Sequence, residues 1–187
     1  MFLSHQQNVP DFDALELSGE LVFVPAGGAE NLAYWASKLQ PINRPEFHLF
    51  DRDAPYASTP KHQAKVEAVN LRSGCKAVST ARREMENYVH YQAINNYATS
   101  HGYVCDLTAQ YGFDDDVPQL LKEKLNSLNP NSHDKWGQSR VKRWLAESVL
   151  PTMTSQMVAE IDPKDEMLGW LDDIRAMLEQ SAASSHG

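Results

Sequence analysis

Short apolar runs alternate with amphipathic stretches over the first half of the chain. Three runs, at 21–24, 47–50 and 75–79, are rich in the β-branched and aromatic residues typical of buried strands. Between them, residues 31–39 and 61–71 carry apolar side chains at helical spacing. This succession of strand, helix, strand, helix and strand predicts an α/β fold, in which a mostly parallel sheet is joined by crossover helices.

The second half of the chain is predicted to be helical. Its helical segments are expected at 86–100, 118–128, 141–149 and 163–180. The resulting division is an acidic lead-in or linker at 1–20, an α/β core at 21–115, a helical C-terminal part of the same domain at 116–180, and a disordered tail at 181–187.

Acidic residues follow each predicted strand. Glu30 comes after the first, Asp51 and Asp53 after the second, and Glu84 and Glu86 after the third. Because ligands gather at the carboxyl ends of parallel strands, we expect these segments to converge at one edge of the sheet. Carboxylates held close together need a cation to stay ionised, and Mg²⁺ prefers oxygen ligands. The alternative is structural: a surface turn at 51–53, and solvated charges at the start of a helix for the later pair.

Three motifs in order resemble the Toprim domain, which topoisomerases, primases and the OLD (overcoming lysogenization defect) nucleases share. They are Val-Phe-Val-Pro-Ala-Gly-Gly-Ala-Glu-Asn-Leu at 22–32, Leu-Phe-Asp-Arg-Asp at 49–53 and Arg-Arg-Glu-Met-Glu-Asn-Tyr at 82–88. The last two are most similar to OLD-type nucleases that accompany ABC-type ATPases in bacterial and phage defence. The resemblance covers residues 20–90 and extends loosely into 137–149.

The resemblance implies a Toprim-like, Rossmann-like sheet and a Mg²⁺- or Mn²⁺-dependent endonuclease that uses two ions to hydrolyse phosphodiester bonds in DNA. Asp51, Asp53 and Glu86 match the catalytic metal ligands of the family, with Glu84 and Glu30 as further ligands. Lys142 matches a lysine that stabilises the transition state. The sequence carries no ATP-binding motif, so the implied ATPase is another chain or a missing N-terminal domain.

One position departs from the family pattern. A glutamate usually follows the first Toprim strand directly, and Pro25 stands there in this chain. Either Glu30 substitutes from the start of the next helix, or one metal site is weakened. The second possibility leaves open a non-catalytic Toprim-like module that regulates an ATPase.

The charge distribution changes what the acidic total implies. The chain has 17 Lys and Arg against 25 Asp and Glu, for a formal net charge of −8, which taken alone argues against a polyanion partner. However, basic residues concentrate at 61–83 and 135–147, where phosphates would lie. The candidate nucleic-acid contacts are Arg82, Arg83, Arg140 and Arg143. The alternative for the basic residues near 140 is a solvated helix face.

Other features narrow the setting. Cys75 and Cys105 form neither a disulfide framework nor a zinc cluster, and no apolar run is long enough to span a membrane. We therefore expect a cytoplasmic protein without a membrane partner. DNA is the favoured substrate, RNA such as tRNA is the alternative, and an oligomer is compatible with the sequence.

Overall fold

The computed structural model describes residues 10–162 and 164–184, which form two compact units. We call them the sheet unit, whose described part comprises residues 10–50, 62–79 and 166–184, and the helical unit, which comprises 51–61, 80–162 and 164–165. Both units are discontinuous in sequence, so their limits differ from the contiguous division predicted above.

The sheet unit contains two of the three predicted strands. β1 (Glu46–Phe50) and β2 (Cys75–Ser79) pair in parallel, with Phe50 opposite Ser79. α3 (Gln63–Asn70) forms the crossover between them. The α/β class with parallel strands is therefore confirmed, on a sheet that has two strands among the described residues.

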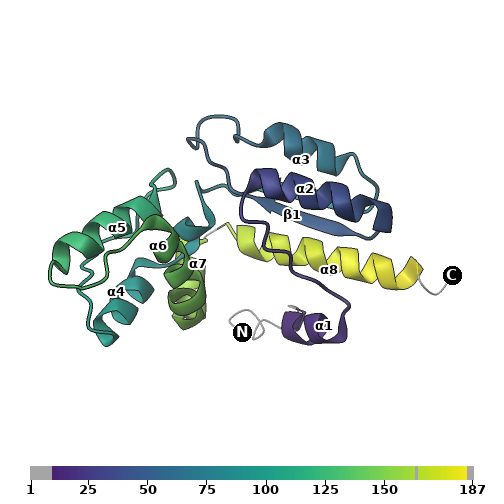
Figure 1. Cartoon of the computed structure of the whole chain (residues 1–187). Coiled ribbons are helices and arrows are strands. Elements are labelled where there is room, and N and C mark those ends of the chain that lie inside the picture. Colours follow the sequence, from purple (N-terminus) through teal and green to yellow (C-terminus); the bar gives the residue numbers. More distant parts are fainter. Residues whose placement is uncertain (1–9, 163, 185–187) are drawn as a thin grey trace. The chain divides into compact units, whose positions relative to one another are not determined.

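The alternation of side chains along the strands explains how helices cover the sheet. Phe50 and Ala77 pack with Val66 and Val69 of α3, and Leu32 of α2 (Ala29–Leu39) joins them. The opposite face meets α8 (Glu166–Ser184), where Lys76 forms an ion pair with Asp173. Figure 1 accordingly shows α2 and α3 on one side of β1 and α8 on the other.

The predicted strand at Leu21–Val24 is wrong. This segment has no regular structure, and the exposed fraction of Val22 is 71% and that of Phe23 is 54%. The predicted lead-in contains a helix, α1 (Phe12–Ser18), while residues 1–9 lie outside the described residues. The predicted tail begins too early, because α8 continues to Ser184; residues 185–187 also lie outside the described residues.

The helical unit packs short helices around one apolar core. They are η2 (Met85–Tyr88), α4 (Tyr91–Ser100), α5 (Val117–Leu128), α6 (Gln138–Trp144), the π-helical turn η3 (Leu145–Val149), η4 (Leu150–Thr152) and α7 (Ser155–Ile161). Figure 1 labels α4, α5, α6 and α7 among them. Leu121 and Leu125, one turn apart on α5, are fully buried, as are Val141 on α6 and Leu145 on η3. Among the described helices, none has the length and apolar character needed to cross a membrane.

The predicted helix over 86–100 is interrupted. Residues 85–88 form a 3-10 turn, Val89 and His90 are extended, and α4 begins at Tyr91. The His90 ring nitrogen Nδ1 accepts a hydrogen bond from the Gln92 N–H and caps α4. The interruption gives Glu84 and Glu86 a turn of their own, which positions the candidate site.

Candidate functional site

The first part of the site is the loop that leaves β1. The Asp51 carboxylate accepts a hydrogen bond from the backbone N–H of Met85, with a distance of 2.9 Å from Oδ1 to N. The N–H of Asp53 donates to the carbonyl oxygen of Arg83 at 3.0 Å. Asp53 has a φ of 50°, in the left-handed region that aspartate tolerates better than most residues. Thus two of the three segments that were predicted to converge, those after β1 and β2, meet.

The second part is the turn around Glu84 and Glu86. Glu84 and Asn87 form a reciprocal capping box, in which the Glu84 N–H donates to the Asn87 side chain at 3.2 Å. The Asn87 amide in turn donates to the carbonyl oxygens of Gly112 and Asp115. Since Asn87 is completely buried, these bonds fix the turn against the loop before α5.

The third part is Lys142, which α6 contributes. Its Nζ lies 2.6 Å from Oε2 of Glu84 and 3.5 Å from Oε1 of Glu86. The Lys142 side chain is 43% exposed, whereas that of Glu84 is 9% exposed and that of Glu86 is 14%. The ammonium group therefore covers two largely buried carboxylates from the solvent side.

The surroundings of Asp51 oppose its ionisation. The pKa of Asp51 is raised to about 6: burial is the largest cause, and the nearby charges of Glu86 and Asp53 also raise it. The hydrogen bond from Met85 and the charge of Lys142 lower the pKa but do not compensate. Asp51 thus carries its charge at neutral pH against a desolvation cost.

Glu84 and Lys142 influence each other's protonation. Burial raises the pKa of Glu84, the hydrogen bond and charge of Lys142 lower it, and the charges of Glu86 and Asp116 raise it further, with a raised pKa as the result. For Lys142, burial lowers the pKa, but the hydrogen bond to Glu84 and the charges of Glu86, Glu84 and Asp51 outweigh that effect and raise it. Lys142 therefore remains an ammonium ion at neutral pH.

Two more cations border the cluster. Arg83 lies 3.8 Å from a Glu84 oxygen and 3.7 Å from an Asp116 oxygen, and Lys61 lies 3.6 Å from an Asp53 oxygen. With Asp51 and Glu86, five carboxylates thus face three cations, Lys142, Arg83 and Lys61. Negative charge is in excess, which is the condition under which a divalent cation binds favourably.

The chemistry of the donors fits Mg²⁺ or Mn²⁺. All four predicted ligands in the helical unit, Asp51, Asp53, Glu84 and Glu86, offer carboxylate oxygens, the ligands that Mg²⁺ prefers. One buried oxygen, Oε2 of Glu86, has no hydrogen-bond partner. Within the described part of the chain, no three His, Cys, Asp or Glu side chains are placed as a metal-ligand group. Lys142 occupies the space between two of the carboxylates instead.

Glu30 belongs to the sheet unit. Its carboxylate pairs with Lys65 of α3 and is 89% exposed. Pro25 lies in the exposed irregular segment before α2. The role of Glu30 as a metal ligand stays a prediction.

Arg82 has a structural role in place of the predicted nucleic-acid contact. It is only 6% exposed, its guanidinium group donates to the carbonyl oxygen of Ile161, and it lies 4.3 Å from the centre of the Phe113 ring. Neighbouring Arg83 is partly exposed but is held by Glu84 and Asp116. The sequence alone does not separate these adjacent arginines.

The α6 arginines lie nearer the solvent. The Arg140 guanidinium stacks over the Trp136 ring at 4.3 Å, and the Arg143 side chain is exposed. With Lys142 between them in sequence, they give α6 three cationic side chains.

Thr80 and Tyr111 also shape the site, although sequence reasoning missed them. The Thr80 hydroxyl accepts from the Arg52 N–H at 2.9 Å and donates to the Arg82 carbonyl oxygen at 2.7 Å, which ties together the loops after β1 and β2. The Tyr111 hydroxyl contacts the carbonyl oxygens of Glu86 and Val89. The position of Thr80 directly after β2 was an available signal; Tyr111 had none.

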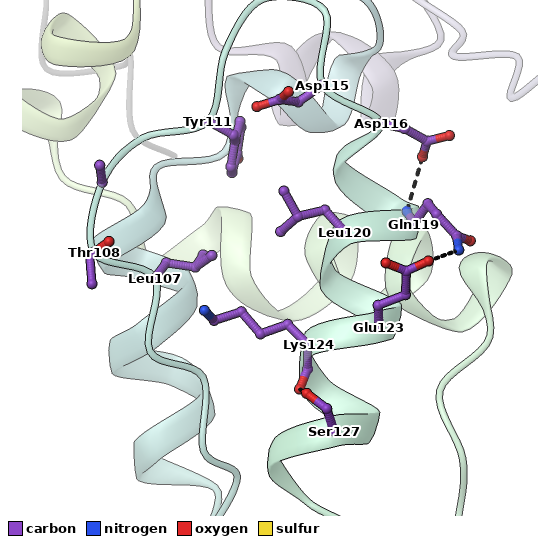
Figure 2. A pocket seen from close by; sticks show the side chains of 11 residues that line it. Leu107, Thr108, Tyr111, Asp115, Asp116, Gln119, Leu120, Glu123, Lys124 and Ser127 are labelled. Atoms are coloured by element: carbon purple, nitrogen blue, oxygen red, sulfur yellow. Dashed lines mark hydrogen bonds between the residues drawn. The ribbon is translucent and has the colours of Figure 1, made fainter.

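An open cavity of about 740 Å³ lies beside α5, and Tyr111 and Asp116 belong to its lining (Figure 2). Several of its polar side chains already have partners within the protein. Asp116 accepts a hydrogen bond from the Gln119 N–H and so caps α5, and the Gln119 side-chain amide donates to Glu123. Lys124 forms an ion pair with Asp106. The cavity is therefore bordered by helix-stabilising contacts, and the carboxylate cluster remains the stronger candidate site.

Comparison of the chain with protein-family models, with curated proteins and with solved structures returned no match.

Proposed function

We propose that this chain is a metal-dependent endonuclease of the Toprim, OLD-like type that hydrolyses phosphodiester bonds in DNA. The observation that carries the proposal is the meeting of two carboxylate pairs, Asp51 with Asp53 and Glu84 with Glu86, beside the Lys142 ammonium group. The fold family, an ABC-type ATPase partner and a role in phage defence belong to the same proposal and rest on the motifs at 22–32, 49–53 and 82–88.

The cluster offers the parts that this reaction needs. Asp51, Asp53 and Glu86 would hold Mg²⁺, with Glu84 beside them; the bound ion supplies a water of lowered pKa and neutralises charge on the phosphate. The Met85 N–H holds the Asp51 carboxylate in place. Lys142 is half exposed, so its ammonium group can reach a phosphate oxygen and stabilise negative charge that develops there.

Binding of the nucleic-acid backbone is assigned to α6. Arg140 and Arg143 flank Lys142 on this helix, and their charges favour phosphates over other ligands. Arg82 is excluded from this role by its burial. These arginines would contact the phosphate backbone of the nucleic acid, which DNA and RNA share. The preference for DNA therefore rests on the resemblance alone.

The test is cleavage of supercoiled plasmid by the purified full chain with Mg²⁺ or Mn²⁺, with EDTA as the blank. We expect cleavage by the wild type and a loss of about 100-fold or more in Asp51→Asn and Glu86→Gln, because each substitution removes a charged metal ligand. Asp106→Asn is the matched control: its carboxylate pairs with Lys124 outside the cluster, so it should cleave like the wild type.

Parallel reactions with tRNA decide the substrate. Faster cleavage of tRNA than of plasmid would replace DNA by RNA and leave the metal site intact. Equal cleavage by wild type and both cluster variants would refute the proposed site. A wild type that neither cleaves nor binds Mn²⁺ would overturn the enzyme assignment.

A further inference from the structure

Lys142 differs from the other cations of the cluster in how it is held. Its ammonium group contacts Glu84 and Glu86, two carboxylates of the proposed metal site. Arg83, by comparison, is also anchored to the backbone carbonyl of Asp114. Lys61 is 61% exposed and approaches its carboxylate only to 3.6 Å. Lys142 therefore makes the closest contact of the three and is tied to the cluster by side-chain charges.

The same carboxylate oxygens cannot serve Lys142 and a divalent cation equally well. Glu84 is nearly buried, so its oxygens have little water to compensate for a lost cation. A positive charge must accordingly be present whenever Glu84 and Glu86 are both ionised. In the metal-free protein the ammonium group supplies that charge, and a divalent ion offers twice the charge to the same oxygens.

We propose that Lys142 is a placeholder counter-ion: it neutralises Glu84 and Glu86 in the metal-free protein, and a divalent cation displaces it toward the substrate. This inference rests on the proposed function, since it assumes that the carboxylates bind metal. Displacement frees an ammonium group on a flexible side chain at the solvent side of the cluster. One lysine thus stabilises the empty site and, after displacement, faces the phosphate, which links metal loading to substrate binding.

The first test measures Mn²⁺ affinity without nucleic acid, from the electron paramagnetic resonance signal of free Mn²⁺. Lys142→Met removes the competing charge but keeps the length of the side chain, so we expect Mn²⁺ to bind about tenfold more tightly. Lys142→Arg keeps the charge and fits carboxylates with two N–H groups, so its Mn²⁺ affinity should fall below that of the wild type. Lys135→Met is the matched control, because the Lys135 ammonium group donates to the Pro130 carbonyl oxygen rather than to a carboxylate of the cluster; it should change Mn²⁺ affinity less than twofold.

The second test follows the ion pair itself in the wild-type chain and does not depend on how a variant folds. A carbodiimide joins amines to carboxylates that are in contact, and mass spectrometry identifies the joined peptides. We expect coupling of Lys142 to Glu84 or Glu86 without metal, and a loss of at least fivefold when Mg²⁺ is added. The Lys124–Asp106 pair, at 2.8 Å, should couple equally under both conditions.

The outcomes separate this inference from the proposed function. If the wild type binds Mn²⁺ and Asp51→Asn does not, but Lys142→Met binds equally or more weakly, Lys142 is not a placeholder while the metal site stands. Unchanged coupling of Lys142 to Glu84 or Glu86 in saturating Mg²⁺ would likewise show that Lys142 is not a placeholder. If neither the wild type nor Lys142→Met binds Mn²⁺, both proposals fail, and the lysine only closes a structural ion pair.

Discussion

Two glutamates with little-exposed side chains, one in each unit, have pKa values shifted in opposite directions. The side chains of Glu46 in the sheet unit and Glu84 in the helical unit are both 9% exposed. Burial raises the pKa of each carboxyl group, yet the final pKa of Glu46 is lowered and that of Glu84 is raised. The partners of Glu46 outweigh the effect of its burial, whereas those of Glu84 do not.

The partners of Glu46 stabilise its ionised form. The Arg72 guanidinium binds both of its oxygens, and the His48 ring nitrogen Nε2 lies 2.8 Å from Oε2. These hydrogen bonds and charges outweigh desolvation. Arg72 and His48 thus provide hydrogen bonds to the Glu46 carboxylate, and we assign this ion pair a structural role.

Glu84 shares its cations with other carboxylates. Lys142 also lies near Glu86, and Arg83 also approaches Asp116. The cluster therefore keeps unneutralised negative charge. Burial, together with the nearby charges of Glu86 and Asp53, also raises the pKa of Asp51. The comparison teaches that the balance of nearby charge, together with burial, separates a structural ion pair from a candidate ligand site.

Removal of Arg72 should have the largest effect on stability. Arg72→Met leaves the Glu46 carboxylate buried without its main partner, and we expect a loss of about 3 kcal/mol in the free energy of unfolding. Urea denaturation at pH 7, followed by circular dichroism, measures it. Arg72→Lys, which restores the charge without two-point binding, should recover part of the loss. A midpoint for Arg72→Met equal to that of the wild type would show that Glu46 does not depend on this pair.

Removal of the Asp51 charge in the helical unit should instead increase the free energy of unfolding. Asp51→Asn keeps an oxygen that can accept the Met85 hydrogen bond but deletes the costly charge. In EDTA at pH 7 we expect the variant to be more stable than the wild type by about 2 kcal/mol, since a pKa shift of one unit corresponds to about 1.4 kcal/mol. A less stable variant would mean that the ionised cluster is fully neutralised, as Glu46 is.

The pH dependence provides an independent check on Asp51. Its pKa is raised from 3.8 in the unfolded chain to about 6 in the folded protein, so the folded state binds more protons between these values. Stability from this group is therefore fully present below pH 3.8 and is lost as the pH rises toward 6. The difference between wild type and Asp51→Asn, measured in EDTA at pH 4, 5, 6 and 7, should widen with pH. A constant difference would assign the effect to packing.

The secondary structure was predictable where the signals for it lie within the segment itself. The helices at 29–39 and 117–128 and both strands were placed to within a few residues, because periodicity and end signals such as Pro118 are local. Leu21–Val24 failed because a short apolar run is a strand only where another strand pairs with it. Pairing is a property of the whole fold, which the run itself does not encode.

The site was predictable to the same extent. Asp51 and the 84–86 turn meet because they follow parallel neighbours whose ends, Phe50 and Ser79, lie opposite each other. The position of Lys142 depends on the packing of α6, 58 residues later in the chain, and only the resemblance pointed to it. The burial of Arg82 also lay beyond the sequence, because its partner Ile161 is 79 residues away.

The smallest effect on stability is expected at Lys65, because its partner is an exposed carboxylate, unlike Glu46 and Glu84. Its partner Glu30 is 89% exposed, so water solvates the carboxylate whether or not the lysine is present. Lys65→Met should therefore change the free energy of unfolding by less than about 0.5 kcal/mol in the same urea experiment, against about 3 kcal/mol for Arg72→Met. Lys65→Arg is the control for the length of the side chain and should be indistinguishable from the wild type. A loss above about 1 kcal/mol in Lys65→Met alone would show that Glu30 depends on its cation more than its exposure indicates. Glu30 would then resemble Glu46, whose stability depends on its partner, and would no longer count as a solvated carboxylate.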